Sequence, residues 1–172
     1  SGSPQLINYD WYSGLNDPTY WGDQAYSVLG QSDSAIVGYS IVNARLAAHK
    51  DSTDSDRNVI VREGTLVDNK PAFPIVNILQ GEGAIGPYSF GYLGTEPLFL
   101  TKLGVYAITA QDITGEKYSQ SRSFFLNGKL LEENGLEEAF ALVYKDMYWL
   151  CLNGRAYILD GLQATQTDRS AP

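Results

Sequence analysis

One pattern, two apolar runs separated by a short polar turn, occurs three times in this chain at intervals of about 50 residues. Residues 97–109 read PLFLTKLGVYAIT, and residues 147–161 read MYWLCLNGRAYILDG, with a glycine at the same place in each turn (Gly104 and Gly154). A less regular copy runs from Leu46 to Arg62, where the turn is longer. Self-similarity at such a period is typical of proteins built from stacked structural repeats.

Each copy of the pattern is preceded by a further apolar segment, at residues 35–41, 88–93 and 139–144. The first two copies are also followed by one, at residues 73–79 and 118–126. Short apolar runs joined by polar turns that contain glycine indicate antiparallel strands in a meander. Four such strands in each repeat are typical of a β-propeller blade. The sequence therefore predicts an all-β fold of antiparallel four-stranded repeats resembling propeller blades, about three in number.

These repeats divide the chain into an N-terminal arm (1–33), two full repeats (34–83 and 84–134), a partial repeat (135–161) and a flexible tail (162–172). The third repeat lacks its fourth strand, which residues 25–29 of the arm would supply as an outer strand. Propellers typically contain four to eight blades, so three leave an open wedge that a second copy would complete into a ring. Two alternatives are a fragment of a larger propeller and a β-sandwich whose hairpins merely look alike.

Packing between the sheets is expected to bury seven apolar side chains: Phe99, Val105, Ile108, Leu142, Trp149, Leu150 and Ile158. Composition supports strands, because 12 Tyr and 17 Gly accompany only 19% charged residues. The net charge of −8 disfavours a nucleic-acid partner and repels anionic membrane surfaces. Neither nucleic acid nor membrane is therefore expected as a partner.

The sequence offers few residues for catalysis, and we predict neither an enzyme nor a cofactor or metal site. The single histidine, His49, cannot form a two-histidine metal site, and we expect it at the surface near a strand end. The single cysteine, Cys151, lies in an apolar run and is interpreted as a small buried hydrophobe. The turn DSTDSD at residues 51–56 has three carboxylates that could hold Ca²⁺, but a solvated hairpin tip is the favoured interpretation.

The most unusual local feature is the arm segment YDWYSGLNDPTYWGD, residues 9–23, in which aromatic residues alternate with Asp, Asn and Gly. Exposed aromatic residues are typical of protein interfaces, and aromatic rings also stack on sugars. We predict that the contact residues, to a protein partner, a second copy or a carbohydrate, are Trp11, Tyr12, Tyr20 and Trp21. In the carbohydrate alternative, a sugar-binding or glycan-processing domain, Asp10, Asp17 and Asp23 would bind hydroxyl groups. A third interpretation is an arm that caps its own sheet.

Over roughly residues 34–161, the chain resembles the propeller-like structural proteins of tailed phages and prophages. The resemblance rests on LGTEPLFLTKLGVYAIT, SQSRSFFLNGKL and FALVYKDMYWLCLNGRAYILDG. It implies a virion component without catalytic activity, acting as a structural or interaction module. The departure from such proteins is the number of repeats, which is smaller than a ring requires.

Overall fold

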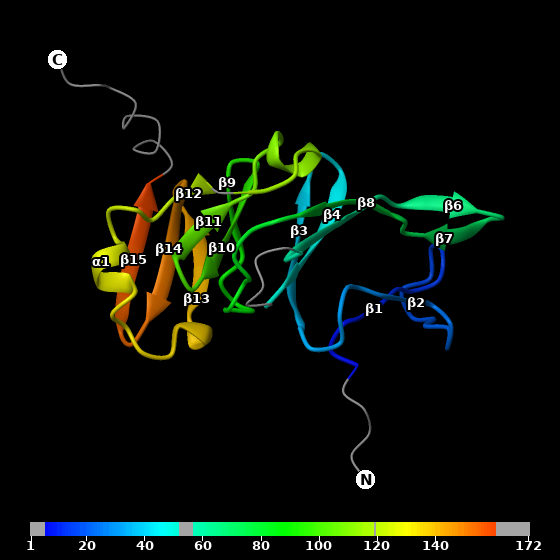
Figure 1. The fold of residues 1–172 in the computed structure, drawn as a ribbon, viewed down its shortest axis with the longest axis horizontal. Helices are drawn as coiled ribbons and strands as arrows, with labels where there is room; N and C mark the ends of the chain where they lie inside the picture. Colours follow the sequence, from blue (N-terminus) through cyan, green and yellow to red (C-terminus); the bar gives the residue numbers. More distant parts are fainter. Residues whose placement is uncertain (1–5, 52–56, 119, 161–172) are drawn as a thin grey trace, which may run out of the picture.

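The computed structural model describes residues 6–51, 57–118 and 120–160, and within them the chain is all-β with several small antiparallel sheets. Three larger sheets follow one another along the chain. In Figure 1 they lie from right to left in chain order, with the second sheet between the other two. We refer to them as sheets one, two and three.

Sheet one contains four strands in the order β3 (Ile36–Val42), β4 (Arg45–Lys50), β5 (Val59–Arg62) and β8 (Ile75–Leu79). The connection from β5 to β8 forms a separate hairpin of β6 (Thr65–Val67) and β7 (Lys70–Ala72). This hairpin projects from the body of the protein in Figure 1. Sheet one matches the four apolar segments of the first repeat, whereas the hairpin was not expected from the sequence.

Sheet two has the order β12 (Gln120–Ser121), β11 (Gly104–Ala107), β10 (Glu96–Thr101) and β9 (Gly91–Leu93). Sheet three is the meander β13 (Phe140–Tyr144), β14 (Met147–Leu152) and β15 (Arg155–Asp160). In the part of the chain that the structure describes, three short helical segments lie in the connections: η1 (Asp112–Thr114), α1 (Asn127–Leu130) and η2 (Leu136–Glu138).

Tight two-residue turns set the register of the hairpins. Asn153 and Gly154 join β14 to β15 with φ values of 52° and 71°, and Lys145 and Asp146 join β13 to β14 with 51° and 59°. Two successive positive φ values define the turn whose twist matches that of paired strands. Six residue pairs of β14 and β15 are consequently in regular register, from Met147 opposite Asp160 to Leu152 opposite Arg155.

Sheet two packs against both neighbouring sheets, and β10 supplies side chains to both cores. Phe99 belongs to the core with sheet one, together with Val61 and Leu79. The residues on either side of it, Leu98 and Leu100, belong to the core with sheet three. Side chains alternate between the two faces of a strand, so a continuous apolar sequence suits a strand that is covered on both faces.

The described residues cover sheet three on one face only, and three of the seven predicted core residues lie on its other face. Tyr148, Leu150 and Leu152 of β14 are buried toward sheet two, while the residues between them are only half-buried. Phe99, Val105, Ile108 and Leu150 are fully buried, as predicted. The prediction was wrong for Leu142 and Ile158, which are exposed, and for Trp149, which is half-buried, because no described segment covers this face.

The N-terminal arm covers the face of sheet one that is turned away from sheet two. Leu29 packs on Ala48 and Ile60 of that face, and Lys50 donates hydrogen bonds from Nζ to the carbonyl oxygens of Leu29 (2.6 Å) and Gln31 (2.9 Å). Two short strands of the arm, β1 (Tyr9–Trp11) and β2 (Tyr26–Val28), form a sheet of their own. Thus the segment expected to complete the third sheet pairs with β1 instead.

The antiparallel all-β character predicted from the sequence is confirmed, but no closed barrel or ring is found among the described residues. The blade-like nature of the repeats and the limits drawn at residues 33, 83, 134 and 161 stay predictions. The tail predicted over residues 162–172 lies outside the described residues.

Candidate interaction surfaces

Strands β1 and β2 bring three aromatic rings together on one face of the arm. The ring centroids of Tyr9 and Trp11 are 6.5 Å apart, and the ring of Tyr26 lies 4.9 Å from each of them. Tyr9 and Trp11 share a face because they are two residues apart in a strand, and Tyr26 is directly opposite Trp11 in the register. Trp11 remains 40% exposed. We call these three rings the arm aromatic surface.

The opposite face of β1 is fixed to sheet one by a buried ion pair. Asp10 accepts a hydrogen bond from Nη1 of Arg62, a residue of β5 that is only 2% exposed. The hydroxyl of Tyr39 donates to Asp10 Oδ1 at 2.9 Å, and Arg62 also donates to the Ser27 hydroxyl and, at 2.7 Å, to the Phe73 carbonyl oxygen. Burial, followed by the negative charge of Asp10, raises the pKa of the Tyr39 hydroxyl. This network holds the arm aromatic surface on a rigid base.

The four predicted contact residues do not form one surface. Trp11 belongs to the arm aromatic surface, whereas Tyr12 packs edge-on against the ring of Phe73 at 5.2 Å and is only half-exposed. Tyr20 and Trp21 are exposed in the loop between β1 and β2, where Trp21 Nε1 donates to the Pro18 carbonyl oxygen at 3.0 Å.

Sequence reasoning did not select Tyr9 and Tyr26 as contact residues. The alternation of Tyr9 and Trp11 about Asp10, which is typical of a strand, could have indicated Tyr9. Tyr26 could be found only from the pairing of β1 with β2.

The carboxylates that the carbohydrate alternative requires are mostly engaged elsewhere. Asp10 is bound by Arg62 and Tyr39 on the face opposite the rings. Asp17 Oδ1 accepts hydrogen bonds from the Thr19 hydroxyl (2.7 Å) and backbone N–H (3.0 Å), and the hydroxyl in particular lowers the pKa of Asp17. Asp23 is exposed. A sugar stacked on the arm aromatic surface would therefore find two of the three carboxylates already hydrogen-bonded within the protein.

A second apolar surface lies on the uncovered side of sheet three, which we call the open face. The register places residues of β13, β14 and β15 side by side there, with Leu142 opposite Trp149 and Trp149 opposite Ile158. Phe140 and Tyr144 of β13 are 51% and 57% exposed. The residues that define the open face are Phe140, Leu142, Tyr144, Trp149, Cys151 and Ile158.

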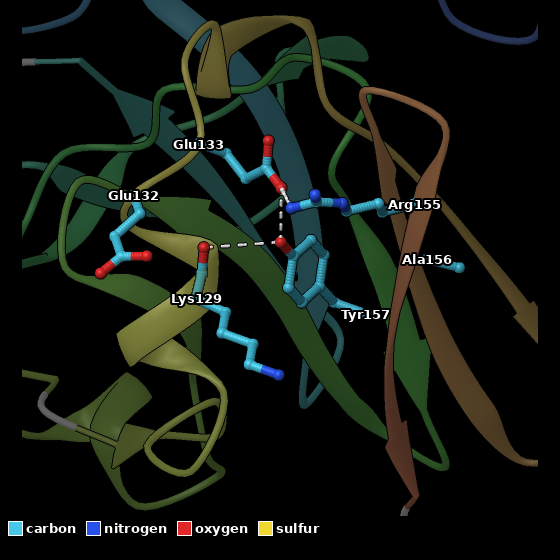
Figure 2. Close-up of a pocket in the computed structure, with 6 residues that line it drawn as sticks. All are labelled: Lys129, Glu132, Glu133, Arg155, Ala156 and Tyr157. Carbon is cyan, nitrogen blue, oxygen red and sulfur yellow. Dashed lines mark hydrogen bonds and ion pairs between the residues drawn. The ribbon is translucent and has the colours of Figure 1, made fainter.

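A cavity of about 720 Å³ opens between α1 and β15, and Figure 2 shows its lining residues, of which Arg155 and Tyr157 point toward the carboxylate of Glu133. Glu133 Oε1 accepts hydrogen bonds from Tyr157 (2.8 Å) and Arg155 (2.7 Å), and Oε2 accepts one from Asn153 (2.9 Å). These bonds, that of Asn153 first, lower the pKa of Glu133. With both oxygens engaged, Glu133 serves to fasten β15 to the segment after α1.

The expectation that His49 is a surface residue was wrong. His49 is fully buried between sheets one and two, where its ring meets Phe90 and Phe99 edge-on at 5.0 Å and 4.5 Å. Its Nε2 lies 2.7 Å from the hydroxyl of Ser40, which is also buried. Burial lowers the pKa of His49 to about 3. This pair is sealed from solvent and is part of the core.

The remaining predictions concern metal, membrane and thiol chemistry. The possible Ca²⁺ turn lies almost wholly at residues 52–56, outside the described residues. In the part of the chain that the structure describes, no group of three His, Cys, Asp or Glu residues could hold a metal ion. The helices found there are too short or too polar to cross a membrane. Cys151 is a free thiol and half-buried on the open face, not fully buried as expected.

Comparison with known proteins gives no match to a family model and no match to a curated protein.

Proposed function

We propose that this protein is a non-catalytic interaction module that binds protein through exposed apolar surfaces of its arm and sheets. The arm aromatic surface carries the proposal. It combines three clustered rings, a composition typical of interface hot spots, with a base held by the buried pair of Asp10 and Arg62. Rigid aromatic side chains lose little conformational entropy on binding.

The repeats of the module are proposed to be blade-like. The first strands of neighbouring sheets meet, as the inner strands of blades do around an axis. The backbone N–H of Ile41 in β3 donates to the hydroxyl of Tyr92 in β9 at 2.8 Å. The Ala141 N–H of β13 donates to the carbonyl oxygen of Tyr88, just before β9, at 2.8 Å. A place in a phage or prophage particle, and hence in the virion, is proposed on the sequence resemblance alone.

The alternative function, carbohydrate binding or glycan processing, would use the same rings. It is less favoured because Asp10 faces the protein interior and Asp17 is bound within its own turn. The three rings themselves offer two hydroxyls and one indole N–H, which suits protein better than sugar, since sugar hydroxyls need many directional hydrogen bonds.

Peptide and glycan arrays, each probed with the wild type and with Trp11→Ala, test the proposed function. We expect peptides that the wild type binds and the variant does not. The matched control is Phe124→Ala, which removes an aromatic ring that is 75% exposed and outside the arm; it should leave peptide binding unchanged. Binding to glycans that Trp11→Ala abolishes would favour the alternative. Peptide binding that survives Trp11→Ala, or is absent altogether, would refute the role of the arm.

A further inference from the structure

The middle strand of sheet three has apolar residues on both faces, but the residues that the structure describes cover only one of these faces. Strand β14 reads MYWLCL, without a charged residue. The comparable strand β10 of sheet two is buried on both faces, between sheets one and three. In sheet one, β5 is likewise buried on both faces, between sheet two and the arm. A strand covered on one face normally alternates apolar and polar residues, so β14 has the sequence of a strand with a second cover.

The open face is large enough to be an interface. A whole aromatic side chain exposes about 200 Å², so Phe140 and Tyr144, each about half exposed, contribute about 100 Å² apiece. Leu142, Ile158 and the adjoining Tyr88 bring the apolar area to the order of 500 Å². Two such faces would bury about 1,000 Å², the lower limit of a specific protein interface.

Residues 161–172 would be a poor cover for this face. They read GLQATQTDRSAP and contain one large apolar residue, Leu162. A cover for the open face must supply several apolar side chains in rows, because the face presents rows of residues from three paired strands. Another sheet with the same pattern meets this requirement, and sheets pack face to face at about 10 Å.

The position of the N-terminal arm limits which surface of a second copy the open face can contact. Closure of two wedges into one ring would place sheet three of each copy against sheet one of the other. Part of the outer face of sheet one is already occupied by Leu29, which packs on Ala48 and Ile60, and by the Asp10–Arg62 pair, so a second sheet cannot lie flat across it. The open face of a second copy has no such obstruction among the described residues, and we take it as the partner surface.

We propose that two copies associate through their open faces, in an isologous two-fold dimer with Trp149 near its centre. Trp149 occupies the central position, between Leu142 and Ile158 in neighbouring strands. Aromatic residues at the centre of an interface commonly supply most of its binding energy. The inference rests on the proposed function in one respect only, namely that the molecule covering the exposed surface is a protein. It does not involve the arm aromatic surface, so either proposal can fail without the other.

Charge determines how the dimer responds to salt. Each copy has a formal net charge of −8, which opposes association of two copies. The six residues that define the open face include no Asp, Glu, Lys or Arg, and Asp160, opposite Met147 at the end of β15, adds an acidic residue at the edge of the same face. Salt screens repulsion between the copies and leaves apolar burial intact. The dimer should therefore become tighter as salt is added, whereas an association held by ion pairs would weaken.

Sedimentation equilibrium of the full chain tests the proposal with Leu142→Glu as the main variant. We expect the wild type to pass from monomer to dimer in the micromolar range that suits a small interface. Leu142→Glu should raise the dissociation constant of the dimer by at least about tenfold, because the dimer would bury the new carboxylate against an apolar face without a partner of opposite charge. The matched control is Val76→Glu in β8, because Val76 is 43% exposed and Leu142 is 45% exposed; it should leave the dimer intact.

The single cysteine provides a second measurement in the same protein. Cys151 is half-buried on the open face, so a thiol reagent should label it more slowly as protein concentration rises. Leu142→Glu should remove this protection. A wild type that stays monomeric up to millimolar concentration, or a dimer that Val76→Glu weakens equally, would overturn the proposal. A chain shortened after Asp160 that dimerises when the wild type does not would show that the tail is the cover.

Discussion

Acidification should destabilise this protein through His49, the one histidine, which is buried in neutral form between sheets one and two. Its pKa is lowered to about 3 by burial, against about 6.5 in an unfolded chain. Above pH 6.5 the ring is neutral in both states and has no effect on the pH dependence of stability. Below pH 6.5 the unfolded state binds a proton that the folded state cannot, so the free energy of unfolding falls as the pH falls.

The size of the effect follows from the difference between the two pKa values. Between about pH 6 and pH 3 the slope approaches about 1.4 kcal/mol per pH unit. Going from pH 6.5 to pH 4.5 should therefore cost about 2 kcal/mol from His49 alone. The folded state does not compensate, because the ring is enclosed by Phe90 and Phe99 and its nearest polar neighbour is the Ser40 hydroxyl.

Urea unfolding of the wild type and of His49→Gln, at several pH values over this range, measures the effect. The carboxylates of the protein titrate in both proteins and largely cancel in the comparison. His49→Gln keeps a polar group near Ser40 but does not titrate, so its stability should fall less steeply with acid. Parallel stability curves for the two proteins would show that His49 is protonated in the folded state, or solvated, and would refute the reasoning.

Two further predictions concern the base of the arm and the two kinds of sheet face. Asp10→Asn should lower the free energy of unfolding by about 3–5 kcal/mol, because it leaves the buried charge of Arg62 without its partner; a loss below about 1 kcal/mol in urea unfolding would contradict this. Phe99→Ala should cost about 3–5 kcal/mol, and Trp149→Ala clearly less in the monomer, because Phe99 is fully buried and Trp149 is not. Equal losses, measured at a concentration below that of dimer formation, would show that the open face is covered within one chain.

Most strands of the three sheets could be predicted from the sequence because they are short apolar runs that end at a turn. The segment predicted at residues 35–41 is β3 (Ile36–Val42), and that at 139–144 is β13 (Phe140–Tyr144). Asn153 and Gly154 mark the turn between β14 and β15 through their preference for positive φ. The spacing of apolar residues and the residue types found at turns are local properties, and a single sequence shows local properties most directly.

The prediction at residues 118–126 was only partly right for a reason that is also local. Only Gln120 and Ser121 pair with β11. Ser123 Oγ then accepts the backbone N–H of Val105 at 2.8 Å, where a longer strand would have continued the ladder. There the chain turns toward α1, and the backbone N–H groups of Leu126 and Asn127 donate hydrogen bonds to the carbonyl oxygen of Ser123. A side-chain hydroxyl that replaces a strand partner leaves little trace in apolar periodicity.

What the sequence could not reveal is which face of each sheet is covered. His49 occupies a strand position, and only the packing of sheet two on that side makes it a core residue. Leu142 and Ile158 have the residue types of a core, and only the lack of a neighbouring described segment exposes them. The same limit applies to the contact residues, since the grouping of Trp11 with Tyr26 depends on pairing across the arm. Coverage arises from tertiary arrangement, which residue type alone does not encode.

The contribution of β10 to two cores affects how the protein unfolds. Because Leu98, Phe99 and Leu100 project alternately into two cores, this strand cannot leave one neighbour without disturbing the other. Sheets one and three are consequently joined through consecutive residues of a single strand, although they do not share a core. The end strands of sheets one and three can open locally, but separation of β10 disrupts both cores at once. The backbone amides of β10 should therefore be among the last to exchange with solvent.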